Sequence, residues 1–505
     1  MRATLLVIVP AVSLVSCADS SGEATDPTST AGASSTEAIG SASSDEAPTS
    51  SVGASSGSTG GESSGGTAST GTGEPLAETW MQGFGAPESQ HPGGLGFAVD
   101  GSLWVAGDVY GAIDLGAGVL APAGSGIYLA KYAATGAALR VQSFAPASGE
   151  ATLTQVAGLV VDGTGAVIVT GWLEGSYTLG GSELVADELD FYVAKWDASG
   201  EPVWGQRFGG ADWQVSSAIA LGPDDSLWLA GAALAPFTMG DISLSGAAST
   251  GMFVARLASD GTPLQGRWWG ETGDQEIRGL AVCGDGSLVI GGFLNDSLQF
   301  GAEQVSTVGD KDMFVAGLDA QGTPAWIRSY GSPSVDYVAQ VACAGTIGFV
   351  GVATGAVQIG GLALTPAGDA DLVLGGLALD GTLGAAVAIT GPEDQLPTGL
   401  AMLPDGDTAL VLTSAGTVTL GDSEYVAAGA SDLVFARYAP GAATPTALIG
   451  VGDGATQRSG PLAVHASGAA ALAGSLAGTA TWPGLPPVTA TGPEDLLLLR
   501  FTPGS

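Results

Sequence analysis

A pattern of short strands and turns returns along most of this chain about every 61 residues. Internal repetition of that period constrains the fold more than any other feature. One part of the unit is an apolar run such as "DFYVAK" (190–195), "GMFVAR" (251–256) or "DLVFAR" (432–437). Runs of this kind end at residues 131, 195, 256, 317, 376, 437 and 500, so successive ends are 64, 61, 61, 59, 61 and 63 residues apart.

Three further segments complete the unit. One strand ends in glycine, as in "DSLWLAG" (225–231), another ends in an aromatic residue and glycine, as in "WGQRFG" (204–209), and a third is a short apolar run such as "GLVVD" (158–162). Gly and Asp turns separate them, and no helical period is present. Four short strands in about 60 residues are typical of a β-propeller blade, whose two faces become buried only against neighbouring blades.

The repeat therefore predicts an all-β fold, a seven-bladed β-propeller of four-stranded blades over residues 78–505. The ends of this region indicate how such a ring is joined. Residues 78–85 contain the aromatic–Gly strand, and the last unit stops after "DLLLLRF" (495–501) without one. We expect residues 78–85 to complete the last blade, with blades that simply begin with that strand as the alternative.

Two stretches carry a resemblance to a known family: "FGGADWQVSSAIALGPDDSLWLAG" (208–231) and "YGSPSVDYVAQVACAGTIGFVG" (330–351). Their pattern resembles the bacterial seven-bladed β-propeller repeat, called SBBP, and the resemblance covers about residues 78–501. It implies an extracellular or surface protein and says almost nothing about activity. Units six and seven depart from the pattern, since they lose the aromatic residue and Thr413 replaces a strand-ending glycine.

The first residues predict export. Residues 1–16 have one arginine and an apolar run too short to span a membrane, which is typical of a signal peptide. Leu14 to Cys17 resemble a bacterial lipobox, which implies lipidation of Cys17, a membrane anchor and, from Ala18, the outer membrane or cell surface. An ordinary signal peptide that leaves a soluble exported protein is the alternative. Residues 17–77, rich in Ser, Thr, Gly and Glu, predict a disordered tether.

Charge and histidine content narrow the possible functions. The net charge of −37, from 13 Lys+Arg against 50 Asp+Glu, disfavours nucleic acid as a partner. Only two histidines, His91 and His465, are present, and neither has an evident catalytic companion in the sequence. A histidine-rich metal site is therefore excluded, and we assign no catalytic residue.

Two rows of aspartates recur on the loops that we place on one rim of the propeller. They are open to two interpretations: a ring that binds Ca²⁺ through carboxylate oxygens, or turns in which each Asp accepts backbone N–H bonds. Turn formation is favoured, because a residue repeated in most blades serves the blade. One row follows the aromatic–Gly strand (Asp212, Asp274, Asp336 and Asp394), and the other begins the third strand (Asp190, Asp312, Asp371, Asp432 and Asp495).

Cys283 and Cys343 end the same kind of strand in adjacent units. In an exported chain they could form a disulfide across two blades, and two buried free thiols are the alternative.

Together these features predict an exported, lipid-anchored propeller that acts as a non-catalytic binding or scaffold module for a protein or glycan at the bacterial cell surface. The alternatives are a surface glycan hydrolase or lyase that uses rim carboxylates, and a structural surface component.

Overall fold

The computed structural model describes residues 79–85, 88–122, 125–147, 153–246, 250–270 and 272–503. These residues form β-strands and turns, and they include no helix long and apolar enough to cross a membrane. The predicted signal peptide, the lipidation of Cys17 and the tether lie outside the described residues and stay predictions.

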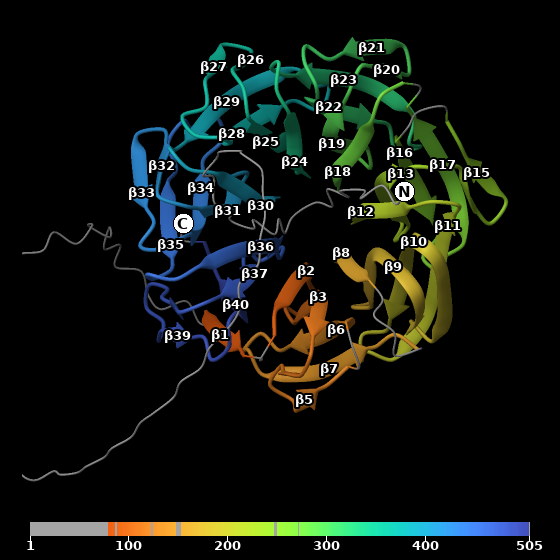
Figure 1. Ribbon diagram of the computed structural model, residues 1–505, viewed down its shortest axis with the longest axis vertical. Coiled ribbons are helices and arrows are strands. Elements are labelled where there is room, and N and C mark those ends of the chain that lie inside the picture. The colour runs from red at the N-terminus through yellow and green to blue at the C-terminus, as the bar shows by residue number, and fades with distance from the viewer. Residues whose placement is uncertain are drawn as a thin grey trace, which may run out of the picture. The chain divides into compact units, whose positions relative to one another are not determined.

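Four antiparallel strands make up each repeated unit, and Figure 1 shows the units arranged as blades around one axis. We name the blades A to G. From the innermost strand outward they are: A, β2 (Gln90–Phe97), β3 (Leu103–Tyr110), β6 (Ser125–Tyr132) and β7 (Ala138–Phe144); B, β8 (Thr154–Val161), β9 (Val167–Leu179), β10 (Ser182–Trp196) and β11 (Pro202–Gly210); C, β12 (Gln214–Leu221), β13 (Leu227–Ala233), β16 (Gly251–Leu257) and β17 (Pro263–Trp269).

The remaining blades have the same order. They are: D, β18 (Gln275–Val282), β19 (Leu288–Leu294), β22 (Asp312–Leu318) and β23 (Pro324–Tyr330); E, β24 (Asp336–Cys343), β25 (Ile347–Ala353), β28 (Asp371–Leu377) and β29 (Leu383–Thr390); F, β30 (Gln395–Met402), β31 (Thr408–Ser414), β34 (Asp432–Tyr438) and β35 (Ala447–Val451); G, β36 (Gln457–Val464), β37 (Ala470–Leu476), β40 (Asp495–Phe501) and β1 (Trp80–Phe84).

The innermost strands form a closed circuit. Each contacts the next, in the order β2, β8, β12, β18, β24, β30, β36 and back to β2. The apolar run is therefore innermost and the aromatic–Gly strand is outermost, as the sequence predicts. The all-β class and the propeller of four-stranded blades are confirmed.

The two ends of the propeller meet in blade G. Strand β1 pairs antiparallel with β40, so that Trp80 lies opposite Arg500 and Phe84 opposite Leu496. The indole N–H of Trp80 also donates a 2.9 Å hydrogen bond to the carbonyl of Ala134 in blade A. Residues separated by most of the chain thus share one sheet.

The connection between the second and third strand of each blade differs from the sequence prediction. We expected long loops on one rim, and the structure has short β-hairpins instead. Examples are β14 (Phe237–Met239) with β15 (Ile242–Leu244), and β32 (Thr417–Leu420) with β33 (Ser423–Val426). Strand β14 pairs with β11 of blade B, and β32 pairs with β29 of blade E. The hairpins therefore lie across outer strands rather than open as binding loops.

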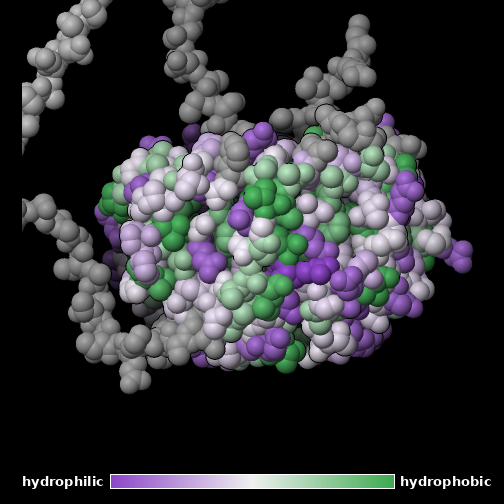
Figure 2. All heavy atoms as spheres, turned by 90° about the horizontal axis from the view of Figure 1, so that it is seen from below, coloured by the Kyte–Doolittle hydropathy of each residue, from purple (hydrophilic) through white to green (hydrophobic). Residues whose placement is uncertain are grey.

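The hydrophobic core lies between blades, not within them. Trp228 of blade C, for example, belongs to one buried cluster with Ile277 and Phe314 of blade D. Trp104 and Trp228 are almost fully buried in such clusters. On the side seen in Figure 2, hydrophobic and hydrophilic residues are interspersed, without one broad apolar band.

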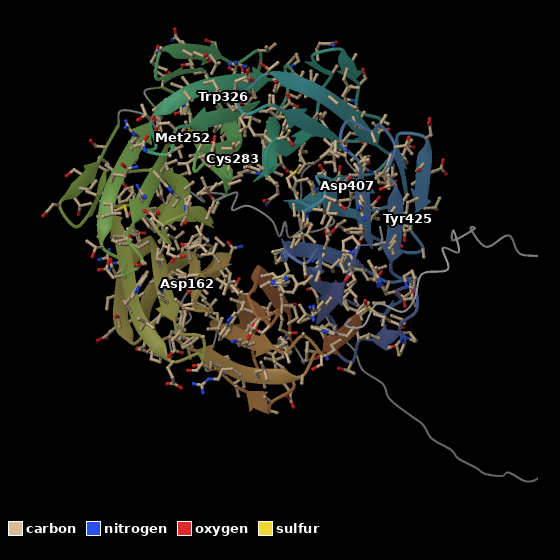
Figure 3. All side chains as sticks on the ribbon, turned by 180° about the vertical axis from the view of Figure 1, so that it is seen from behind. Asp162, Met252, Cys283, Trp326, Asp407 and Tyr425 are labelled. Carbon is tan, nitrogen blue, oxygen red and sulfur yellow. A yellow bond between two sulfur atoms is a disulfide. The ribbon has the colours of Figure 1, made fainter. Side chains whose placement is uncertain are left out.

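A disulfide joins blades D and E near the axis. Cys283 directly follows β18 and Cys343 ends β24, and their Cα atoms are 5.0 Å apart. The bridge closes a loop of 60 residues at the ends of two neighbouring inner strands. Figure 3 shows Cys283 near the middle of the ring, inside Trp326.

Candidate functional site

The aspartates that begin the third strands cap their own turns. Each is almost fully buried and accepts the backbone N–H of the residue four positions earlier. The donor–acceptor distances are 2.8 Å for Val308 to Asp312, 2.7 Å for Ala367 to Asp371, 2.9 Å for Ala428 to Asp432 and 2.7 Å for Thr491 to Asp495. Because an unpaired buried N–H is costly, these carboxylates stabilise the end of each hairpin.

The same carboxylates explain the glycine of the aromatic–Gly strand. A Cβ atom on Gly331 would overlap the carboxylate of Asp312, and one on Gly452 would overlap that of Asp432. Glycine is therefore needed for close approach. Asp190 differs, since it lies within the longer strand β10 and pairs with Arg207 at 2.6 Å.

The aspartates predicted to follow the aromatic–Gly strand do not occupy equivalent positions in the structure. Our alignment of Asp336 with the others was wrong. Asp336 is the buried first residue of β24 and accepts the N–H of Ser332 at 2.6 Å. Asp212 and Asp394 are exposed, and Asp274 lies in the turn before β18. One-residue differences in turn length place similar sequences at different positions.

A row of buried glutamines occupies the position of Asp336 in most other blades, and the sequence analysis missed it. The amide oxygen of Gln214 accepts the N–H of Gly210 at 2.7 Å, and that of Gln457 accepts the N–H of Asp453 at 3.2 Å. The recurrence of glutamine four or five residues after the aromatic–Gly strand was the available signal. The first residues of the inner strands are Gln90, Thr154, Gln214, Gln275, Asp336, Gln395 and Gln457.

These contacts bear on the calcium hypothesis. The hydrogen bonds to each capping carboxylate come from N–H groups, an arginine or a tyrosine hydroxyl of its own blade, and the charge of Asp336 in the next blade also acts on Asp312. Within the described ranges, no three His, Cys, Asp or Glu side chains converge as a metal site requires. The aspartate rows therefore offer no ready oxygen cage for Ca²⁺.

Every inner strand contains a β-bulge after its third residue. In β18 the register shifts between Ile277 and Gly279, so Arg278 is the extra residue, and β12 and β30 shift at the matching place. A bulge re-aims the extra side chain. In blade F it directs the hydroxyl of Thr398 to that of Ser459 in blade G, at 2.6 Å.

The second residue of each inner strand, which follows the buried capping residue, is different in every blade. We call these second residues the axial rim. The first residue of most inner strands is a repeated, buried polar residue, whereas the second does not repeat and is half-buried in five blades, Val215 and Glu276 being buried. The axial rim consists of His91, Gln155, Val215, Glu276, Tyr337, Leu396 and Arg458.

Between blades G and A, the axial rim gathers charged and polar groups around Glu494. Its carboxylate accepts hydrogen bonds from Ser475 at 2.7 Å and Arg458 at 3.2 Å, and His91 Nε2 lies 4.0 Å away. Burial lowers the pKa of His91, Glu494 raises it in part, and Arg458 lowers it. Ser475 donates to the carboxylate and not to the imidazole, so these groups are not ordered as a nucleophile and its base.

A buried acid lies directly across the sheet from His91. Asp108 on β3 pairs in register with His91 and accepts the N–H of Val156 at 3.0 Å. Burial raises the pKa of Asp108 well above its usual value. The hydroxyl of Tyr192 is buried near this carboxylate without a hydrogen-bond partner among the described residues. Burial thus shifts the pKa of this acid upward and that of the neighbouring imidazole downward.

Between blades D and E, the axial rim gathers aromatic rings around Arg278. The guanidinium carbon lies 4.2 Å from the ring centre of Tyr337 and 5.4 Å from that of Phe293, and its Nε lies 3.2 Å from Glu276. Lys311 also lies over Phe293, at 4.3 Å. Burial raises the pKa of Glu276, and the charges of Arg278 and Lys311 oppose that rise.

His465 lies at the opposite end of the inner strand of blade G, in the turn after β36. Its Nδ1 is 2.8 Å from the hydroxyl of Ser467 and accepts the N–H of the same residue at 3.2 Å. His465 caps a turn. Likewise, no catalytic companion for it is evident in the sequence.

Comparisons with known proteins show only distant structural likeness. No protein-family model and no curated protein matches the chain, so membership of the SBBP family stays a prediction. The crystal structure of a puromycin hydrolase has a TM-score of 0.44 and 15% identity over 78% of this chain, which spans about half (51%) of that one. The polysaccharide lyase Uly1 has a TM-score of 0.38 and 9% identity, over 82% of this chain and 90% of that one. A protein of unknown function from Dyadobacter fermentans has a TM-score of 0.36 and 10% identity, over 84% and 99%. Likeness this distant carries no argument about activity.

Proposed function

We propose that this protein is an exported, lipid-anchored, seven-bladed propeller that binds a protein or glycan at the bacterial cell surface through its axial rim. Among the described residues, five four-stranded sheets and two six-stranded sheets, each of which contains four blade strands and a hairpin, support the blade number. The sequence of residues 1–77 supports export, anchoring through Cys17 and the tether.

The observation that carries the proposal is the change from repetition to diversity between two adjacent positions. Basic residues are divided in the same way between repeated and non-repeated positions. Nine of the twelve Lys and Arg residues within the described ranges lie on third or fourth strands, and the other three are Arg458 of the axial rim and Arg278 and Lys311 beside it. Half-buried aromatic rings beside arginine are typical of binding hot spots.

The proposal is tested by binding of the full chain to purified cell-envelope polysaccharides and envelope proteins, measured on an immobilised surface. The double variant Arg278→Ala, Tyr337→Ala should lose about 2 kcal/mol or more of binding free energy. His465→Ala, at the other end of the strands, is the matched control and should bind normally. Binding that ignores the rim variant would place the site elsewhere, and a chain that binds nothing would favour the structural alternative.

A second candidate function is acid–base chemistry on a glycan. The observation that favours it is the pair His91 and Asp108, whose pKa values shift in opposite directions across one sheet. Pairs of this kind separate an acid from a base at neutral pH. A lyase or hydrolase of this type would release reducing ends or unsaturated sugars from polysaccharides. Asp108→Asn should abolish that release, while Asp212→Asn, in an exposed turn, should not. A wild-type chain with no activity on a broad polysaccharide panel would end this candidate.

A further inference from the structure

The third strand of most blades ends in a basic side chain that lies against the first turn of the same blade. In blade C, Arg256 Nη2 lies 2.6 Å from Asp224 Oδ2, its Nε donates to the hydroxyl of Ser226 at 3.0 Å, and its guanidinium lies 5.3 Å from the ring centre of Trp228. In blade F, Arg437 pairs with Asp405 at 2.5 Å. The first turn is thus an arginine site built from a carboxylate, a hydroxyl and an aromatic face.

Blade D has the hydrogen-bond acceptors of this site but lacks the basic side chain. The matching residue on its third strand is Gly317, since Gly317 occupies the place in β22 that Arg256 has in β16. Asp285 accepts the N–H and O–H of Ser287 at 3.0 and 2.6 Å, as Asp224 does with Ser226. Blade E has Gly376 in this position, but its turn (Cys343–Ala344–Gly345–Thr346) has no acid. Among the described blades, D alone pairs the acid with a glycine.

A hollow of about 440 Å³ lies at the seam of blades D and E beside Gly317, where a Cβ atom would overlap the indole of Trp326. Asp285, Ser287, Gly317 and Trp326 line it together with Asp319 and Ile347. Trp326 supplies the aromatic wall, and its indole N–H is already engaged with the carbonyl of Leu379 at 2.9 Å. Arg328 lines the outer side of the hollow but is paired with Glu303 at 3.0 Å. Hydrogen bonds from Ser287 lower the pKa of Asp285, which keeps it a carboxylate.

We propose that this hollow binds an alkylguanidinium or alkylammonium group, the chemistry of an arginine or lysine side chain, on the acid that corresponds to the partner of Arg256 in blade C. The site lies at the opposite ends of the strands from the axial rim and is independent of the function proposed there. Its ligand would insert an apolar stem against Trp326 and Ile347 and place its cation on Asp285 and Ser287.

Calorimetric titration of the full chain with butylguanidinium tests the proposal, with butylurea as the neutral isostere. We expect one site with a dissociation constant on the order of 1–10 mM and no binding of the urea. Asp285→Asn should weaken binding about tenfold, since it removes the charge-assisted partner. Asp260→Asn, the same change in an exposed turn of blade C, should leave binding unchanged.

A second variant tests the comparison between blades without depending on Asp285. Arg256→Ala empties the matching site in blade C, so the stoichiometry should rise from one to two. No binding, equal binding of butylurea, an unchanged affinity in Asp285→Asn, or a stoichiometry that stays at one in Arg256→Ala would each overturn the proposal. A blocked peptide with a single arginine separates the sources: tighter binding of the peptide indicates a side chain of a protein partner, and equal binding indicates a free small cation.

Discussion

The seam between blades G and A and the seam between blades D and E are held by different means. Both have the same indole hydrogen bond, from Trp80 to Ala134 and from Trp326 to Leu379. The first seam adds a strand, β1, from the far end of the propeller, whereas the second adds the Cys283–Cys343 disulfide. The ring thus closes without a covalent bond, and its covalent bridge joins blades that the chain already connects.

The largest effect should come from the strand that closes the ring. Trp80→Ala removes a buried indole and its hydrogen bond, and should cost about 3–5 kcal/mol of unfolding free energy. Chemical denaturation followed by circular dichroism measures this, with Val99→Ala, at a 74% exposed site, as the control. A loss below about 1 kcal/mol would mean that β1 is not what holds blade G to blade A.

The disulfide should come next. Replacing both cysteines with alanine frees a 60-residue loop, and chain entropy gives a loss of about 4 kcal/mol. Reduction of the wild type should lower its stability to that of the double variant and leave the variant unchanged. If reduction has no effect on the wild type, the seam is held by packing alone.

Removing a capping aspartate should cost less unfolding free energy, and the cost should differ between blades G and D. Asp495 accepts the backbone N–H groups of Thr491 and Gly492 and the hydroxyl of Thr491, whereas Asp312 accepts the N–H of Val308 with a weaker contribution from that of Gly309. Asp495→Ala should cost about 2–4 kcal/mol and Asp312→Ala about 1–3 kcal/mol, because each orphaned N–H carries its own penalty. Asp212→Ala is the exposed control. The reverse order of costs would contradict the capping account.

The smallest effect is a pH dependence in blade D. Burial raises the pKa of Asp312, the Val308 N–H lowers it and the charge of Asp336 raises it. A raised pKa in the folded state stabilises the fold below the ordinary value, and that stabilisation is lost as the pH rises through the folded value. The difference in unfolding free energy between Asp312→Asn and the wild type should therefore shift in favour of the variant as the pH rises from about 4 to about 7.

Asp224→Asn in blade C is the matched control for this slope. Hydrogen bonding by Ser226 lowers the pKa of Asp224, so this variant should lose stability relative to the wild type as the pH rises towards the ordinary value of an aspartate, with no further slope above that value. Parallel slopes for the two variants would contradict the assignment.

The sequence predicts those parts of the fold that depend on local pattern. Alternating apolar residues and Gly or Asp turns define the four strands and their order, and the aspartate before each third strand is correctly interpreted as a turn former. The Cys283–Cys343 pair was left open, because the distance between two strands is not a property of either strand alone.

Features set by pairing between strands could not be predicted. The bulge at Arg278 exists only relative to the register of β19. The hairpins are too short, at two to four residues a strand, for a periodic signal. The absence of a base at Gly317 is visible in the sequence, but it acquires meaning only when Arg256 is seen on Asp224.

The hairpins across the outer strands have a consequence for a protein displayed at high density. A four-stranded blade leaves one row of backbone N–H and C=O groups at its outer edge, which is a template for pairing with another copy. Strand β14 covers that row at the end of β11, and β32 does so at the end of β29. If the proposed anchoring holds, neighbouring copies would meet outer edges that are capped at blades B and E, which lowers the tendency of those two edges to pair.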